Sequence, residues 1–175
     1  MYYLVLSSGG GESFVVGALI AILAAIFIWL KNKSKPVRNM IATEIKLQVN
    51  PNDIGSIVKK GYAEIRANKL SSAMELFQKA VNLSHNNLDA LAGIAYAYHL
   101  SKDYHNSKTA IEEYLKNIDP NNFDYSTGAL VTYLNGHHFF MENKLEEAQN
   151  CKQNANKMSI FSEDIQEIIT NLNLY

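Results

Sequence analysis

Three short polar segments divide the chain beyond residue 50 at nearly equal intervals. They are NPND at Asn50–Asp53, SHNN at Ser84–Asn87 and DPNN at Asp119–Asn122, so their first residues, at positions 50, 84 and 119, are 34 and 35 apart. A period of this length is typical of stacked helical hairpins, in which each unit buries an apolar face against the next. Two of the three prolines lie inside these segments and the third precedes them, so the chain between the segments is free to be helical.

Small residues recur with a second, independent spacing of 12 and then 7 positions. The three sets are Gly61, Ala73 and Ala80; Ala95, Ser107 and Tyr114; and Gly136, Ala148 and Ala155. Two antiparallel helices approach to about 8–10 Å only where the side chains at their crossing are small. The spacing therefore predicts three helix pairs. Because Tyr114 is large, we expect looser or rearranged packing in the middle pair.

Two stretches with this spacing resemble the tetratricopeptide repeat (TPR) family. GYAEIRANKLSSAMELFQKAVNLSHNN (Gly61–Asn87) is similar to such a repeat, and LEEAQNCKQNANKM (Leu145–Met158) resembles the second helix of another. The resemblance covers about residues 54–160. It implies an all-α, right-handed helical solenoid of three helix-turn-helix repeats within residues 54–162, at 54–87, 88–122 and 129–162.

The ends of the repeat region carry further helix signals. The interval from Ala95 to Gly136 is 41 residues rather than 34, so we expect the fifth repeat helix to have an extended start. Ser162 precedes two acidic residues and a one-sided row of apolar residues, which predicts a capping helix within residues 163–175. The basic segment 31–53 contains at residues 37–49 either a half-repeat helix or a flexible linker.

The resemblance also implies a partner-binding groove, because the first helix of each TPR hairpin lines a concave surface. The corresponding residues here are Val58, Tyr62, Ile65, Arg66, Ala92, Tyr96, His99, Leu100, Tyr133, His137, Phe140 and Met141. These residues are mostly aromatic or aliphatic, so we expect an apolar or amphipathic segment of a protein partner. The alternative is that individual rings pack against the neighbouring hairpin.

The residues that hold a carboxylate tail in TPR co-chaperones of heat-shock proteins are missing. The matching positions carry Val58, Tyr62, Gly93, Leu130 and Leu134. None of these side chains can pair with a carboxylate through charge-assisted hydrogen bonds. Binding of heat-shock protein tails through such a carboxylate clamp is therefore not expected.

An apolar stretch precedes the repeats. Residues 14–30 contain no charged side chain, and at about 1.5 Å per residue a helix of this length spans roughly 25 Å, a short membrane crossing. A buried core helix is the alternative, and a signal peptide would need a basic segment ahead of it. Residues 1–13 have no Lys or Arg, whereas basic residues follow the stretch at Lys31, Lys33, Lys35 and Arg38. The positive-inside rule thus predicts a short non-cytoplasmic tail, with everything after residue 30 on the cytoplasmic or stromal side.

Composition argues against several other classes. The 16 Lys and Arg residues balance 17 Asp and Glu residues, so no basic excess indicates nucleic acid. The chain has five histidines but no HExxH or paired Cys/His motif, and we expect these histidines to be solvated or partner-facing. Cys151 is the single cysteine and is expected to be a packing residue. We expect no metal, no cofactor and no enzymatic activity.

Two classes of function fit these expectations. One is a membrane-anchored interaction scaffold, such as an assembly factor for a membrane protein complex. The other is a targeting or import receptor, or a bacterial inner-membrane adaptor, that binds hydrophobic peptide segments. In layout the chain is also similar to small TPR proteins of cyanobacteria and algal plastids that assist photosystem I assembly, which implies a thylakoid or bacterial inner-membrane location.

Overall fold

The computed structural model describes residues 22, 23, 25, 26, 28, 35–119, 124–160 and 162–174. Within these residues every regular element is a helix and no strand occurs, so the expected all-α class is confirmed. The chain divides into two compact units, Met1–Ala42 and Thr43–Tyr175.

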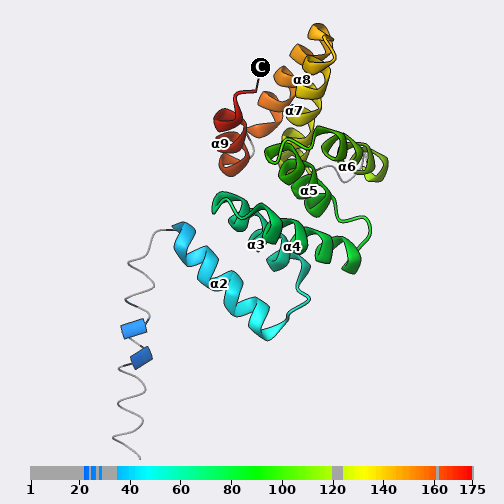
Figure 1. Cartoon of the computed structure of the whole chain (residues 1–175). Helices are drawn as coiled ribbons and strands as arrows, with labels where there is room; N and C mark the ends of the chain where they lie inside the picture. Colours follow the sequence, from blue (N-terminus) through cyan, green and yellow to red (C-terminus); the bar gives the residue numbers. More distant parts are fainter. Residues whose placement is uncertain are drawn as a thin grey trace, which may run out of the picture. The chain divides into compact units, whose positions relative to one another are not determined.

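Eight helices have defined ends within the described residues (Figure 1). They are α2 Lys35–Val49, α3 Ile54–Arg66, α4 Leu70–Leu83, α5 Leu88–Leu100, α6 Tyr104–Asn117, α7 Tyr125–Met141, α8 Leu145–Ser159 and α9 Glu163–Leu172. In the second unit α3 packs on α4, α5 on α6 and α7 on α8, while α5 also contacts α4 and α7. Helix α5 buries nine of its 13 residues and α7 ten of its 17, so these two helices lie at the centre of the packing.

The turn inside each helix pair has the same backbone geometry. Asn68, Lys102 and Asn143 have φ values of 58°, 62° and 60°, in the left-handed region. In each turn this residue donates its N–H to the carbonyl three residues back, and the next residue donates to the carbonyl five residues back. This is the Schellman motif, which satisfies carbonyls at the end of a helix. The three pairs are therefore repeats in backbone conformation as well as in sequence spacing.

The polar segments that recur in the sequence cap the helices that follow them. The side chain of Asp53, the last residue of NPND, accepts a hydrogen bond from Ser56 N at 2.9 Å and begins α3. Asn87, the last residue of SHNN, accepts one from Ala90 N at 2.8 Å and begins α5. An acceptor at this position satisfies an N–H that has no partner inside the helix. The period of 34 residues thus reflects repeated helix starts.

The third pair begins differently. Asp124 caps α7 through Ser126 N and Thr127 N, and α7 has 17 residues against 13 in α5. The additional residues lengthen α7 at its start, as the interval of 41 residues predicts. Tyr114 is buried rather than loosely packed, because its hydroxyl lies 3.4 Å from Thr127 Oγ1 in this added turn. The middle pair thus buries Tyr114 at the position where the other two pairs have Ala80 and Ala155.

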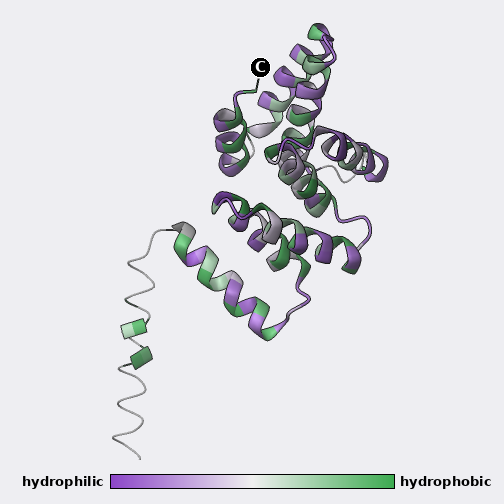
Figure 2. Cartoon of the chain, in the orientation of Figure 1, coloured by the Kyte–Doolittle hydropathy of each residue, from purple (hydrophilic) through white to green (hydrophobic). Residues whose placement is uncertain are grey.

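The core at the first two pairs is organised around Phe77 of α4, which is fully buried. Its ring edge meets Gly61 of α3 and Gly93 of α5, and a Cβ built on Gly61 would lie 2.6 Å from Phe77 Cε1. The other small residues of the recurring sets, Ala73, Ala80, Ala95, Ser107, Gly136, Ala148 and Ala155, are buried as well. Most helices carry both hydrophobic and hydrophilic residues (Figure 2), consistent with one face packed on this core.

Among the described residues, no helix is long and apolar enough to cross a membrane. The expected span 14–30 lies outside the described residues except for five helical positions, and so do the tail 1–13, Lys31 and Lys33. Residues 37–49 lie within α2, so the helix rather than the linker is observed there. Pro36 is the second residue of α2. Proline is tolerated in the first turn of a helix, because a backbone N–H at that position would have no carbonyl partner inside the helix.

Candidate functional site

Most residues of the expected partner groove are covered by the protein itself. Seven of the twelve are buried, namely Val58, Ile65, Ala92, Tyr96, His99, Tyr133 and His137. Tyr62 and Leu100 are half-buried, while Arg66, Phe140 and Met141 are exposed. Because α5 packs against both α3 and α7, most of the residues that the TPR resemblance assigns to a groove are covered in this structure, and their contact with a partner stays a prediction.

The C-terminal residues complete this cover. Leu174 donates its N–H to Tyr133 Oη at 3.0 Å, just beyond α9. Arg66 of α3 forms an exposed ion pair with Asp164 of α9 at 3.7 Å. The Ser162 side chain caps α9 by accepting from Ile165 N, and Ile165 and Ile169 are buried. The helix over Glu163–Leu172 thus covers part of the α7 surface that the TPR resemblance assigns to a partner.

Two of the three expected partner residues that are exposed lie at one hairpin end. Phe140 and Met141, in the last turn of α7, are each 44% exposed, and Leu145 at the start of α8 is exposed as well. We call these three residues the α7–α8 tip. Lys144 Nζ lies 5.6 Å from the centre of the Phe139 ring beside them. A cluster of exposed apolar side chains at a tight turn is a candidate protein-contact surface.

Three histidines meet between the second and third helix pairs. The ring centre of His99, near the end of α5, lies 4.9 Å from that of His137 and 6.0 Å from that of His138, both on α7. The ring centre of Tyr104, at the start of α6, lies 5.2 Å from that of His99. All three histidines are buried, which corrects the expectation that these side chains are solvated or partner-facing. We call His99, His137 and His138 the histidine cluster.

Burial holds the histidine cluster in the neutral state. Desolvation, with smaller contributions from His137 and His138, lowers the pKa of His99 to about 4. Desolvation also lowers the pKa values of His137 and His138. Within the described part of the chain, both ring nitrogens of His99 are buried without a hydrogen-bond partner. A buried polar group without a partner typically costs about 1–3 kcal/mol, so His99 is held in place at the expense of stability.

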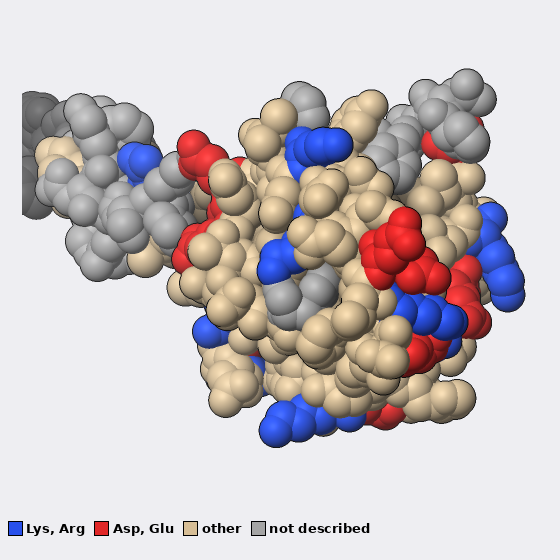
Figure 3. Space-filling view, turned by 90° about the horizontal axis from the view of Figure 1, so that it is seen from above, with Lys and Arg blue, Asp and Glu red and all other residues tan. Residues whose placement is uncertain are grey.

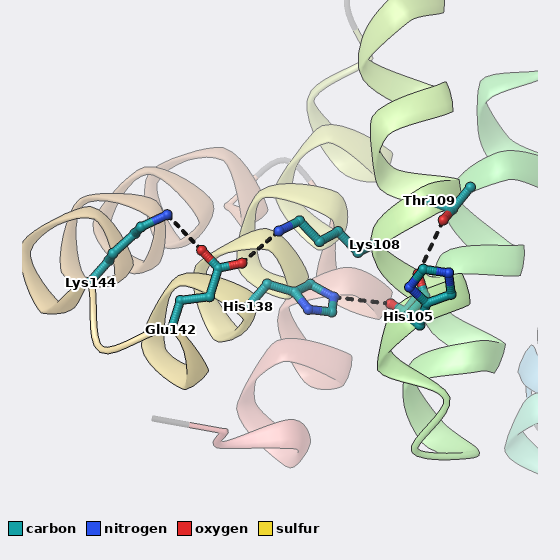
Figure 4. A network of polar contacts seen from close by, with 7 residues as sticks. His105, Lys108, Thr109, His138, Glu142 and Lys144 are labelled. Carbon is teal, nitrogen blue, oxygen red and sulfur yellow. Dashed lines mark hydrogen bonds and ion pairs between the residues drawn. The ribbon is translucent and has the colours of Figure 1, made fainter.

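Polar contacts beside the cluster join α6 to the end of α7 (Figure 4). His138 Nε2 lies 3.4 Å from Ser107 Oγ, and Ser107 in turn donates to the carbonyl of Ala95 at 3.0 Å. Next to them, Glu142 accepts from Lys108 and Lys144 at 2.5 and 2.6 Å. These two cations lower the pKa of Glu142 to about 2, so its carboxylate stays ionised.

The described residues provide no group of three or more His, Cys, Asp or Glu side chains that could hold a metal ion. Cys151 is half-buried on α8, and burial raises the pKa of its thiol, so its thiolate is disfavoured. Acidic and basic side chains are interspersed on the face shown in Figure 3.

The sequence did not reveal the histidine cluster. Its members are 38 and 39 positions apart, and only the pairing of α5 with α7 brings them together. The available signal was that histidines occur near the ends of α5 and α7, the first helices of the second and third pairs. A repeat fold places the first helices of successive pairs next to each other. Compared with protein-family models and with curated protein sequences, the chain gives no match.

Proposed function

We propose that this protein is a membrane-anchored TPR-like scaffold that binds protein partners, as an assembly factor for a membrane protein complex. The observation that carries this proposal is the threefold recurrence of one hairpin, with the same Schellman turn at Asn68, Lys102 and Asn143. Each hairpin also buries small residues at the spacing that resembles the TPR family. Repeats of this kind present surfaces for proteins rather than reaction centres, and we propose no enzymatic activity.

The membrane anchor is supported by the described residues of the apolar stretch. Ile22, Leu23, Ile26 and Ile28 are helical and between 48% and 64% exposed. Neighbouring apolar side chains that are left exposed mark a surface meant for lipid or protein. The basic residues that follow would place the helix pairs on the cytoplasmic or stromal side. Tethering raises the effective concentration of partners in the same membrane, so a small contact surface suffices.

The α7–α8 tip is the partner contact that we propose. Phe140, Met141 and Leu145 need no rearrangement to reach a partner, whereas Tyr133 and His137 are covered. Exposed aromatic and aliphatic side chains around a turn fit an apolar or amphipathic segment of a complex subunit. Because the layout of an anchor followed by three repeats is similar to that of small TPR proteins that assist photosystem I assembly, we propose photosystem I subunits as candidate partners beside subunits of bacterial inner-membrane complexes.

Affinity purification of the full chain from native membranes, after chemical cross-linking, tests this proposal. The wild type should recover subunits of a membrane complex, and the double variant Phe140→Ser with Met141→Ser should lose most of them. Leu115→Ser on α6 is the matched control, because Leu115 is an apolar side chain that is 50% exposed and is not part of the α7–α8 tip. Retention of every partner by the double variant would contradict the tip as contact, and recovery of presequence peptides alone would favour an import receptor.

A further inference from the structure

The contact between two helix pairs depends on buried groups that can take up protons. His99 is only 3% exposed and lies edge-on to the rings of Tyr104, His137 and His138. His99 lies on α5, and its ring contacts Tyr104 of α6 and the two histidines of α7. It is therefore part of the contact between the α5–α6 pair and the α7–α8 pair. Aromatic rings in edge-to-face contact pack well while the imidazoles are neutral.

We propose that the histidine cluster makes this contact an acid-sensitive joint, which holds while the three imidazoles are neutral and loosens when they become protonated. Protonation would place like charges on rings whose centres are 4.9 and 6.0 Å apart. Repulsion at such a distance is strong where water is excluded. Burying the new charges adds a desolvation cost.

The charges around the cluster do not compensate for this repulsion. The rings of Tyr104 on α6 and Phe140 on α7 contact the histidines, and the nearby charges are Lys108 of α6 and Glu142 at the end of α7. Lys108 disfavours a proton on His138, and Glu142 favours one. Glu142 shares its single negative charge between Lys108 and Lys144, so it adds little attraction for a protonated His138.

The direction of the pH dependence follows from the lowered pKa values. The pKa of a histidine in the unfolded chain is about 6.5, and the pKa values of the three histidines in the folded cluster are lower. Between these values the unfolded chain binds more protons than the folded chain, so the folded state loses stability as the pH falls below about 6.5. Above that pH the cluster has no such effect.

Thermal unfolding of the full chain in nonionic detergent, at about pH 7.5 and about pH 5, tests the joint. The melting temperature of the wild type should fall, and His99→Phe should remove roughly 5 °C of that fall because Phe keeps the ring but cannot titrate. His105→Gln is the matched control, since His105 is an exposed histidine of α6 outside the cluster. This control should show the same fall as the wild type.

Two further measurements on the wild type keep the proposal falsifiable if His99→Phe does not fold. NMR titration of the imidazole carbons should show the three histidines of the cluster with midpoints below about 6.5, the value of an unperturbed histidine. Hydrogen exchange at about pH 5, corrected for its intrinsic pH dependence, should show protection lost first in the last turns of α5 and α7, before α3 and α4. Midpoints of about 6.5 or above for the three cluster histidines, or a uniform loss of protection, would overturn the joint.

Discussion

Replacing Gly93 by alanine is a sharp test of the packing that joins the first two helix pairs. The new Cβ would lie 2.5 Å from Phe77 Cζ and 2.7 Å from Cδ1. Comfortable carbon contacts are about 3.5–4.0 Å, so the ring or a helix would have to move by roughly 1 Å. The ring is fully buried, its edge also meets Gly61, and Tyr62 packs edge-on against it at 5.2 Å between centres, so it has little room to move.

The expected magnitude follows from two opposing effects. Overpacking of this kind costs about 1–3 kcal/mol, and the tight surroundings of Phe77 place it at the upper end. Alanine in place of glycine inside a helix recovers about 1 kcal/mol of helix propensity. We therefore expect Gly93→Ala to lower the free energy of unfolding by about 2 kcal/mol.

Urea unfolding of the full chain in detergent, followed by far-UV circular dichroism, measures this change. Gly55→Ala is the matched control, because no atom lies within 4 Å of its built Cβ and only the propensity gain remains. Adding Phe77→Leu should rescue part of the loss, so the double-mutant cycle should be non-additive by roughly 1 kcal/mol or more. A stabilising Gly93→Ala, or additive effects in the cycle, would refute the reasoning.

Two further predictions concern the helix-pair turns. Lys102→Gly should stabilise the protein by up to about 1 kcal/mol in the same unfolding assay, because Lys102 has a φ of 62°, which a lysine adopts only at a cost in free energy. Ser101→Gly, at the neighbouring residue, is the control and should not stabilise the protein. Lys108→Met should raise the pKa of Glu142 from about 2 toward its ordinary value, because one of its two cations is removed, and an unchanged carboxyl titration by NMR would contradict that account.

The positions of the helix starts could be predicted because their caps are encoded locally. Asp53 and Asn87 are residue types with a strong preference for the N-cap, and each ends a recurring polar segment. The turns inside the pairs are only partly encoded in this way. Asn68 and Asn143 are of a type that readily adopts the left-handed conformation at a helix end, whereas Lys102 gives no local signal of it.

The candidate site was harder to predict because its exposure depends on distant parts of the chain. The TPR resemblance assigns Tyr133 to the partner-facing side of its helix, but Leu174, 41 residues later, donates a hydrogen bond to its hydroxyl. The same holds for His99, whose burial depends on α6 and α7 together. Periodicity identifies the apolar side of a helix, and it does not tell whether a partner or the protein's own helices cover that side.

Burial of the inner helices restricts how a partner can bind. Binding along the sides of α5 and α7 would require breaking the contacts among α3, α5 and α7 and the hydrogen bond from Leu174 to Tyr133, with buried apolar area exposed in exchange. Binding at the α7–α8 tip breaks none of these contacts, since Phe140 and Met141 are accessible already. A ligand shifts a protein to another conformation only by its differential affinity for that state. Binding at the tip therefore needs less binding free energy than binding along the inner faces, and a partner that uses the inner faces would have to bind strongly enough to separate the helix pairs.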